Sequence, residues 1–419
     1  MRRALYAANI LIGNIERKGG IYMGQKAPGY NKFAGENVAP ALAKPGVKGM
    51  PKPTAIRIDQ VEKQYAMMWS NGGIYQTILD ATLDAKPYQL KAWVMSRTNP
   101  MQTLTDRAKV EQSLKKLDLV VSCDLYISET AAYADYILPE STYLERDEEI
   151  QDKSGKNPAY YVRQRVVETI GNTRPSWQIF KEIGQALGLE QFYPWDNIQT
   201  LQLMQLNRDH SLLEHIKKMG YVSYGKALML REPEMVTEFV KAYPNAKSVD
   251  ADGTYASSMS FKTPSGKIEL TSPKIEGMAP GRGVIKHRDV QLKQADELYF
   301  IQGKVAVHTN GATHNIPMLA NLMSKNAIWI HPITAGRLDI HSGDAIRLTS
   351  SVGSEEGTAL VTPGIRQDAV FAYMGFGSKN KELVRATGKG IHCGNLLPNV
   401  IAPICGMNLH TTGVKLVKI

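Results

Sequence analysis

The densest group of polar side chains lies between Gln302 and Asn315, directly after a short apolar run. It offers amides, hydroxyls, two imidazoles and one ammonium, from Gln302, Lys304, His308, Thr309, Asn310, Thr313, His314 and Asn315. Gly303 and Gly311 lack a Cβ, which lets a backbone approach a ligand closely. Lys304 can place its charge on a phosphate, while amides and hydroxyls hold other oxygens. These residue types favour the binding of a phosphorylated ligand.

Other kinds of chemistry find less support in the sequence. His308 and His314 are six residues apart in a loop, with no carboxylate or cysteine companion, so metal binding is the weaker interpretation and acid–base work stays open. There is no Gly-x-Ser-x-Gly motif, and no His lies near Cys123 to form a dyad. The three cysteines of the chain give neither a disulfide framework nor an iron–sulfur pattern.

A second set of polar residues follows two predicted strands. Leu119 to Val121 is a β-branched run that closes on Asp124, and Ser128-Glu129-Thr130 then predicts a short helix start. An earlier strand, Leu90 to Met95, leads to Asn99-Pro100. Asp124 could accept two N–H donors from a purine or pterin ring, although spacing alone favours simple helix capping. Because ligands bind at the carboxyl ends of parallel strands, we expect these side chains to share one edge.

The elements that must position these residues form two patterns. Leu90 to Pro139, with a helix at Asp106 to Lys116, alternates strand and helix and predicts a parallel sheet. The segment Leu298 to Ile419 instead shows short strands between Gly turns, with one helix near Pro332 to Leu338, and predicts a closed β-barrel. Its strands are expected at Leu298 to Ile301, Ala345 to Ser350, Gly357 to Val361, Ala369 to Tyr373 and Val414 to Ile419.

The middle of the chain is less regular. We expect a strand at Tyr161 to Thr169 and a helix from Arg174 to Leu187 that Gly188 ends. Beyond Glu190, only one helix, near Met235 to Ala242, is predicted before Ile285. Further helices are expected at Ile58 to Trp69 and Gly73 to Ala85, and an irregular excursion at Gly24 to Pro53.

Composition sets broad limits. A chain of 419 residues with 43% hydrophobic and 21% charged residues is ordinary for two or three globular domains. No apolar run approaches ~20 residues, so no membrane span is expected. The first residues do not fit a signal peptide, because their short apolar stretch contains Asn9 and lacks a small-x-small cleavage site. The net charge of +10 suits a phosphate-rich ligand or an acidic partner. Nucleic acid is less favoured, because no Lys/Arg cluster stands out.

The segment Glu129 to Pro139, followed by Glu145, resembles the ETA-x-x-AD-x-x-LP signature of molybdopterin oxidoreductases, the dimethyl sulfoxide reductase family. Further stretches are similar to family motifs: Asn9 to Gly20, Asn99-Pro100, Arg174 to Ile183, Thr263 to Leu270 and Trp329 to Leu348. The resemblance implies an α/β core portion at 1–190, an irregular connection at 191–295, and a six-stranded double-psi barrel at 296–419 that binds molybdopterin dinucleotide.

The implied cofactor is molybdenum held by two molybdopterin guanine dinucleotides. The resemblance assigns contacts with it to Asn99, Cys123, Asp124, Glu129, Thr130, Arg146, Gln302, Gly303, Lys304, His308, Thr309, Asn310, Gly311, Phe376, Asn395 and Lys415. Lys304 stands where the family often has Arg, which loses bidentate geometry but keeps the charge. Phe376 lies in Gly375-Phe376-Gly377, which is equally typical of a hairpin turn. No catalytic residue and no metal ligand is expected within these residues.

Within the family, Gly303-Lys304 and the tail Pro403 to Asn408 are similar to thiosulfate and polysulfide reductase catalytic subunits. This implies two-electron reduction of a small inorganic sulfur compound in anaerobic respiration. Electrons would come through an iron–sulfur subunit from a membrane quinol-oxidising anchor subunit, in the periplasm or on the outer face of the cytoplasmic membrane. Tetrathionate, arsenate, nitrate or formate chemistry, a non-catalytic scaffold and a general β-barrel binding module are the alternatives.

Family members also carry an N-terminal [4Fe–4S] domain with clustered cysteines and a residue that ligates molybdenum. No such segment precedes Ala4. We therefore expect this chain to correspond to the carboxyl-terminal part of the family architecture and to be inactive by itself.

Overall fold

The computed structural model describes residues 2–15, 19–21, 42–46, 49–50, 54–60, 73–153, 159–223, 263–286 and 293–419. The expected helix at Met235 to Ala242, most of the excursion at Gly24 to Pro53, and most of the helix at Ile58 to Trp69 lie outside these residues. The chain forms two compact units. Unit 1 comprises Met1–Lys52, Ser141–Glu276 and Gly281–Lys286, and unit 2 comprises Pro53–Glu140, Gly277–Pro280 and His287–Ile419.

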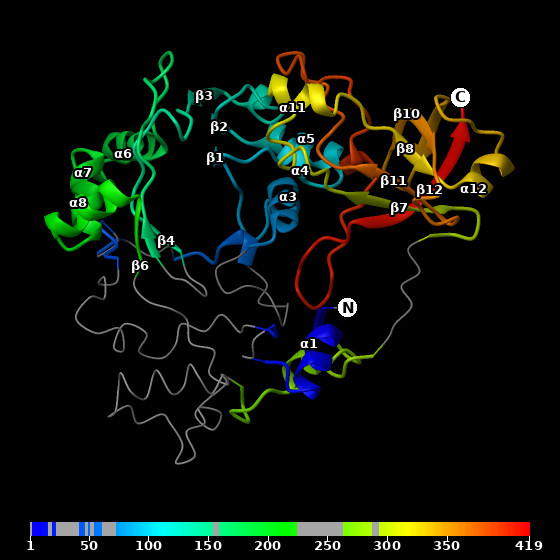
Figure 1. The fold of residues 1–419 in the computed structure, drawn as a ribbon, viewed down its shortest axis with the longest axis horizontal. Helices are drawn as coiled ribbons and strands as arrows, with labels where there is room; N and C mark the ends of the chain where they lie inside the picture. The colour runs from blue at the N-terminus through cyan, green and yellow to red at the C-terminus, as the bar shows by residue number, and fades with distance from the viewer. Residues whose placement is uncertain are drawn as a thin grey trace. The chain divides into compact units, whose positions relative to one another are not determined.

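Unit 2 contains the predicted parallel sheet. Strands β1 (Ala92–Ser96), β2 (Leu119–Asp124) and β3 (Tyr136–Pro139) pair in that order and are all parallel, with Val94 opposite Val121. Helices α3 (Tyr75–Asp84), α4 (Pro100–Thr103) and α5 (Arg107–Lys116) lie beside the sheet (Figure 1). They bury apolar side chains against it. The buried cluster is Leu79, Met95, Met101, Val110, Leu114 and Val120. The prediction of three adjacent parallel strands is confirmed.

Local chemistry explains where these helices begin and end. The Asp106 side chain accepts the Lys109 N–H at the start of α5, and Lys115 and Lys116 occupy its last turn, where the helix dipole favours cations. After β2 the helix is only a 3-10 turn, η2 (Ala131–Tyr133), before β3 begins. The short helix expected after Ser128 is therefore present.

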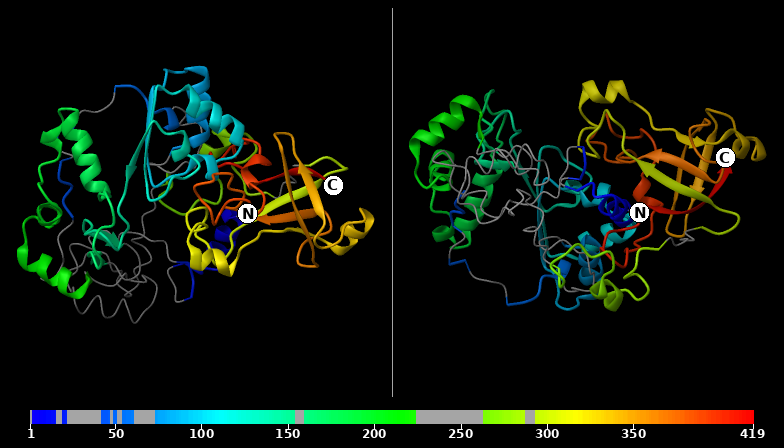
Figure 2. Two further views of the ribbon diagram at one scale, coloured as in Figure 1. Left: turned by 90° about the horizontal axis from the view of Figure 1, so that it is seen from above. Right: turned by 60° about the horizontal axis from the view of Figure 1, so that its bottom comes forward.

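The rest of unit 2 is a closed barrel, as predicted. Its strands are β7 (Leu298–Gly303), β8 (Ile328–Ile330), β9 (Ala345–Thr349), β10 (Ser354–Val361), β11 (Ala369–Tyr373) and β12 (Thr411–Lys418). They close in the order β10-β8-β11-β7-β12-β9 with mixed parallel and antiparallel pairs. Figure 2 shows these strands, coloured yellow-green to red, gathered around the C-terminus. Helix α11 (Pro317–Leu322) precedes β8, and α12 (Pro332–Arg337) follows it.

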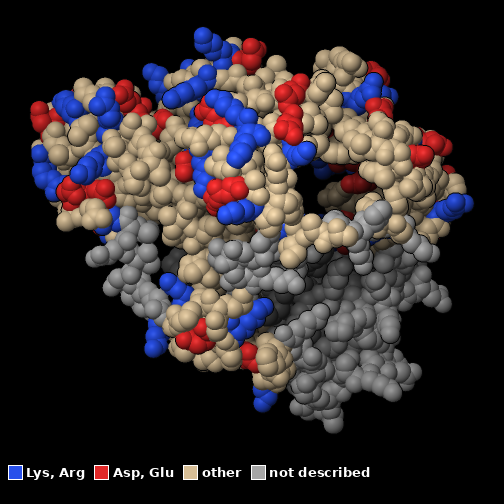
Figure 3. Space-filling view, turned by 180° about the vertical axis from the view of Figure 1, so that it is seen from behind, with Lys and Arg blue, Asp and Glu red and all other residues tan. Residues whose placement is uncertain are grey.

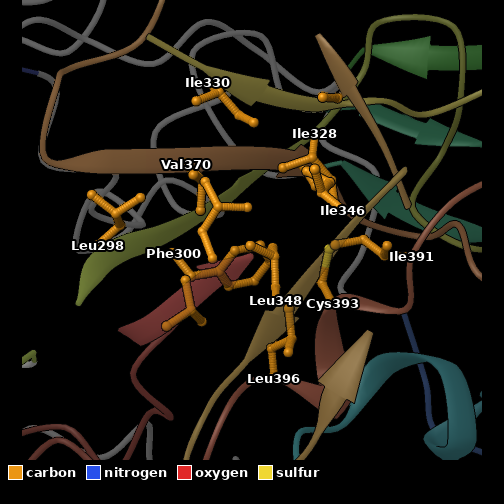
Figure 4. Close-up of a cluster of buried hydrophobic side chains, with 14 of the residues drawn as sticks. Leu298, Phe300, Ile328, Ile330, Ile346, Leu348, Val370, Ile391, Cys393 and Leu396 are labelled. Atoms are coloured by element: carbon orange, nitrogen blue, oxygen red, sulfur yellow. The ribbon is translucent and has the colours of Figure 1, made fainter. Parts of the chain in front are cut away.

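The barrel interior is a continuous apolar core. Figure 4 shows side chains from β7, β8, β9 and β11 pointing toward one another, together with Ile391, Cys393 and Leu396 from the segment that contains η5 (Cys393–Asn395). Phe300, Ile328, Ile346 and Leu348 are fully buried. Burying such side chains contributes ~1.5–3 kcal/mol each, so the core is a principal source of stability for unit 2.

Unit 1 differs from the sequence expectation in its middle. The expected strand at Tyr161 to Thr169 is wrong, because the observed strand, β5, covers Ala159–Tyr161, between β4 (Gln151–Lys153) and β6 (Tyr221–Ser223). Beyond it, the N–H groups of Val166 and Val167 both donate to Leu144 O, which is a loop contact and not a strand ladder. Both valines are exposed, so the apolar run had no core to bury it.

Helices make up most of the remainder of unit 1. α1 (Arg2–Leu11), α6 (Ser176–Ala186), η3 (Glu190–Phe192), α7 (Ile198–Gln205) and α8 (His210–Met219) are formed, and a short helix, α10 (Pro273–Met278), follows later. α6 matches the predicted helix, with Pro175 at its start and Gly188 in the left-handed region just after it. α7 and α8 were not predicted; Asn197 and Asp209 cap them by accepting N–H groups of Thr200 and Leu212.

Two general observations complete the fold. On the face drawn in Figure 3, Lys and Arg side chains are interspersed with Asp and Glu, so positive charge is not gathered into one stripe there. Within the described ranges, we find no helix with the length and apolar character that a membrane crossing requires.

Candidate functional site

Three predicted residues at the carboxyl edge of the sheet hold one another in place. Asn99, after β1, accepts hydrogen bonds on its Oδ1 from the Thr130 N–H (3.2 Å) and hydroxyl (2.7 Å). Its amide donates to Glu129 Oε2 at 2.6 Å, and Thr130 Oγ1 also accepts the Met101 N–H at 3.0 Å. Glu129 and Thr130 are buried. We call Asn99, Glu129 and Thr130 the edge network, and it confirms that the two loops meet at one edge.

Asp124 and Cys123 end strand β2 at the same edge. Asp124 Oδ1 accepts the Leu125 N–H at 2.7 Å, and burial raises the pKa of this carboxyl. Cys123 is buried, and its burial raises the pKa of the thiol, so it is a neutral packing residue. Asp124 is thus placed with the edge network, while Cys123 contributes to the sheet interior.

The loop after β7 carries most of the other predicted residues, and we call 302–316 the histidine loop. A Cβ on Gly303 would lie 2.8 Å from the Phe371 ring, and one on Gly311 would lie 2.9 Å from Gln102 Cγ. Both glycines are therefore required by close packing within the protein. This is a different reason from the ligand approach that the sequence suggested.

Two imidazoles form the centre of the histidine loop. The rings of His308 and His314 are stacked at 4.0 Å, and Phe376 meets His314 edge-on at 4.3 Å. His314 Nε2 lies 2.6 Å from Asn310 O, and His308 Nδ1 lies 3.3 Å from Thr313 Oγ1. Burial, and then the neighbouring His308 charge, lowers the pKa of His314 to about 4, so this ring is neutral at pH 7. His308 Nε2 is buried and has no partner among the described residues.

The histidine loop lies against the edge network. Gln102, in α4 two residues after Pro100, donates to Phe376 O at 2.9 Å. The negative charge of Glu129 raises the pKa of His314, although less than burial lowers it. Gly375 and Gly377 flank Phe376 with φ of 91° and 79°, a left-handed turn that a side chain would strain. The structure thus confirms that the loop and the sheet edge face one another. Phe376 joins them, because its carbonyl accepts from Gln102 and its ring meets His314.

Other predicted residues are placed differently. Lys304, Thr309 and Asn310 are exposed on the histidine loop. Gln302 Nε2 lies 2.7 Å from His410 Nδ1, a histidine before β12 that sequence reasoning missed. Because β12 runs antiparallel to β7 with Val414 opposite Leu298, Lys415 lies toward the barrel end away from Gly303, where it pairs with Asp296 at 2.9 Å. Arg146 lies in unit 1, buried and paired with Glu148 at 2.8 Å.

A cavity of about 660 Å³ lies in unit 2 beside the edge network. Glu129 and Asn395 line it, and both were predicted. Arg107, Lys379 and Lys381 also line it and were not predicted. The signal that could have found the lysines is their spacing, Lys-x-Lys two residues after Gly375-Phe376-Gly377. Among the residues that the structure describes, no group of three His, Cys, Asp or Glu side chains is arranged to hold a metal ion.

Comparison with known proteins gives consistent matches. A model for molybdopterin oxidoreductase matches residues 1–186, and one for the molydopterin dinucleotide binding domain matches residues 298–412. Thiosulfate reductase molybdopterin-containing subunit PhsA of Salmonella typhimurium is 56% identical over 416 residues, 99% of this chain and 55% of that protein. The assimilatory nitrate reductase catalytic subunit of Bacillus subtilis is 25% identical, over 83% of this chain and 47% of the relative.

A solved structure supports the fold. Acetylene hydratase from Pelobacter acetylenicus superposes with a TM-score of 0.66 at 19% identity, over 85% of this chain and 48% of that chain. At this identity the likeness concerns the fold alone. The chain spans about half the length of the curated relatives it matches, 55% and 47% for the two named above.

Proposed function

Since this chain belongs to the molybdopterin oxidoreductase family, we propose that it is the cofactor-binding part of a reductase that acts on thiosulfate. The observation that carries the proposal is the 56% identity, over 99% of this chain, to a thiosulfate reductase subunit. The nitrate reductase relative is only 25% identical. Polysulfide, the other sulfur compound that the sequence suggested, is the second substrate to be tested.

The residues present fit a molybdopterin cofactor. Buried polar atoms in α4, at the start of α5 and in the histidine loop have no partner among the described residues: Gln102 Oε1, Arg107 Nη1 and His308 Nε2. Unsatisfied buried polar atoms cost ~1–3 kcal/mol each, so a site that retains several of them suits a ligand rich in donors and acceptors. When bound, the cofactor supplies a molybdenum centre that exchanges two electrons. This chain's own residues would bind and orient it.

The roles we propose follow from exposure. Lys304, Thr309 and Asn310 are exposed and available to phosphate oxygens, whereas His308 would offer its free ring nitrogen to a polar heterocycle. Asn99, Glu129 and Thr130 would act by holding the edge in shape. A neutral His314 stacked on His308 would fix the ring plane without adding charge. In this proposal the cofactor is the bis(guanine dinucleotide) form.

The remaining parts of the proposal concern what lies beyond these 419 residues. We propose that a further segment supplies the molybdenum ligand and a [4Fe–4S] cluster, since this chain covers 55% of the Salmonella subunit. An iron–sulfur subunit and a membrane quinol-oxidising anchor would deliver electrons, in anaerobic respiration on the outer face of the cytoplasmic membrane. The word subunit in the relative's name supports an assembly of this kind.

Metal analysis and a reduced-viologen assay test the proposal. The 419-residue chain alone should carry no stoichiometric molybdenum and reduce neither thiosulfate nor polysulfide, whereas the same chain joined to a segment that supplies the ligand and cluster should do so. In the joined protein, Lys304→Ala should weaken dinucleotide retention by roughly 5- to 150-fold, because it removes a phosphate-facing cation. Full occupancy and turnover in the short chain, or a joined protein that reduces nitrate but not thiosulfate, would contradict the proposal.

A further inference from the structure

A second cavity, of about 300 Å³, lies within unit 1, and we call it the aromatic cavity. Four aromatic rings and six other residues line it: Trp177, Phe180, Tyr193 and Trp195, with Ala43, Lys44, Pro45, Glu149, Leu201 and Gln205. The planes of the Tyr193 and Trp195 rings meet at 64° with their centroids 5.6 Å apart, so these rings form a corner instead of a flat wall. A Cβ on Gly184, in α6, would lie 2.2 Å from Tyr193 Cε2, so the helix needs a glycine where Tyr193 packs. The volume suits a compact ligand, since clefts for small molecules start at about 300 Å³.

Hydrogen bonds join three segments of the cavity wall. The Ala43 N–H donates to Gln205 O, at the end of α7, at 2.8 Å. The Gln205 side chain accepts the Ile150 N–H at 2.8 Å and donates to Ile150 O at 3.2 Å. Because Ile150 directly follows Glu149, these bonds hold the backbone beside Lys44 and the backbone beside Glu149 against the same helix. The wall is therefore largely preorganised for a ligand.

Two charged side chains of opposite sign line the aromatic cavity. Lys44 and Glu149 are both exposed, and in the described part of the chain neither forms an ion pair. Glu149 accepts one hydrogen bond there, from the Gln151 amide at 3.3 Å. One positive and one negative charge thus remain available to a ligand that carries both signs.

The aromatic rings and their indole groups also have unused capacity. Lys and Arg side chains lie over other rings, those of Tyr133, Tyr143 and Tyr299, and over none of the four rings of the cavity among the residues that the structure describes. The indole N–H groups of Trp177 and Trp195 are buried and have no acceptor among the same residues. Trp195 is only 9% exposed. A buried donor without an acceptor lowers stability, so a ligand oxygen beside either indole would be favourable.

We propose that the aromatic cavity binds a compact zwitterion that carries an alkylated ammonium group and a carboxylate. Aromatic faces attract organic cations, and the Glu149 carboxylate adds to this attraction. The carboxylate of the ligand lies toward Lys44 and supplies oxygen acceptors. A neutral apolar ligand would use neither charge, and a simple cation would leave Lys44 without a partner. The inference is independent of the proposed function, because no residue of this cavity is among the proposed cofactor contacts.

Calorimetric titration of the full 419-residue chain with three probes tests the ligand class. Glycine betaine carries both groups, choline keeps the trimethylammonium group but lacks the carboxylate, and 3,3-dimethylbutanoate keeps the carboxylate but has carbon in place of the charged nitrogen. Glycine betaine should bind most tightly. Binding of 3,3-dimethylbutanoate should be about five- to thirtyfold weaker, because the attraction between cation and rings is lost. Choline should be weaker by a smaller factor, since Lys44 is exposed and its charge is screened.

Substitutions assign the binding to the aromatic cavity. Phe180→Leu keeps an apolar side chain but removes a ring, and Glu149→Gln removes the negative charge. Each should weaken the binding of glycine betaine by about threefold or more. Glu214→Gln, at an exposed glutamate of α8 that does not line the cavity, is the matched control for Glu149→Gln and should have no effect. Since Glu149 is exposed, its substitution should leave the fold intact.

The outcomes separate the parts of the inference. Glycine betaine that binds more tightly than both other probes, and less tightly after Phe180→Leu and Glu149→Gln, supports it. Equal binding of 3,3-dimethylbutanoate overturns the role of the ammonium group, and equal binding of choline overturns the role of the carboxylate. Glycine betaine that does not bind, or that binds both variants as it binds the native chain, overturns the site. Molybdenum content and thiosulfate reduction are not involved, so failure here is distinct from failure of the proposed function.

Discussion

The edge network and the histidine loop belong to the same unit and face each other, yet they satisfy their polar atoms in opposite ways. In the edge network, the Asn99 side chain bonds to both Glu129 and Thr130, and Thr130 also accepts the Met101 N–H. In the histidine loop, His308 is buried, as Glu129 is, but its Nε2 has no partner among the described residues.

This difference separates two roles that look alike in the sequence. A fully paired buried network stabilises the loops it joins, because breaking one bond leaves its other members unsatisfied. A buried polar atom without a partner lowers stability and is available to a ligand. We therefore expect substitutions in the edge network to lower stability at neutral pH, and substitution of His308, which carries the unpartnered nitrogen, to affect mainly ligand retention.

The largest expected effect is on pH dependence and belongs to the histidine loop. The pKa of His314 falls from its ordinary 6.5 to about 4 on folding, so between these values the unfolded chain binds more protons than the folded one. Stability from this group is complete above pH 6.5 and is lost as the pH falls to about 4, by about 3 kcal/mol in total. Urea unfolding at pH 7 and pH 4.5 should show this loss in the native chain.

His314→Gln should show a smaller loss over the same range, because it removes the titrating group. The exposed His215 of α8 offers a matched control, and His215→Gln should behave as the native chain does. Identical pH profiles for the native chain and His314→Gln would mean that His314 does not stay neutral in the folded state.

The next largest expected effect belongs to the edge network. Asn99→Ala removes the amide that serves both Glu129 and Thr130 and leaves two buried groups short of partners. The free energy of unfolding should fall by about 2 kcal/mol. Denaturant unfolding measures it, with Gln191→Ala, an exposed residue of η3, as control. A loss no greater than that of Gln191→Ala would show that the edge network does not hold the two loops together.

The smallest effect on stability is expected at His308 in the histidine loop. His308→Leu removes a long hydrogen bond to Thr313, at 3.3 Å, but also removes a buried nitrogen that has no partner. Losing the hydrogen bond lowers stability, and removing the unpartnered nitrogen raises it. The free energy of unfolding should therefore change by less than about 1 kcal/mol. Molybdenum content of the joined protein should fall in His308→Leu. Unchanged content, or a stability loss as large as that of Asn99→Ala, would remove the distinction between the two regions.

The sequence by itself determined the elements and their order. Alternation of apolar runs and polar turns predicted β1 to β3 and the helix that starts at Asp106, because local propensity and a capping side chain act over a few residues. The same local signals predicted most barrel strands. They failed at Tyr161 to Thr169, where Val166 and Val167 are exposed, and in α7 and α8, whose caps Asn197 and Asp209 were overlooked.

Only the tertiary structure decided which polar residues meet and which are already paired. Asn99 and Glu129 are 30 residues apart in the chain but form one hydrogen bond, whereas Lys415 and Gln302 are drawn apart by the antiparallel register of β12 and β7. The Arg107, Lys379 and Lys381 cavity joins segments from both halves of unit 2. The physical reason is that pairing, burial and charge compensation depend on distances between remote segments, which residue types and spacing along the chain do not contain.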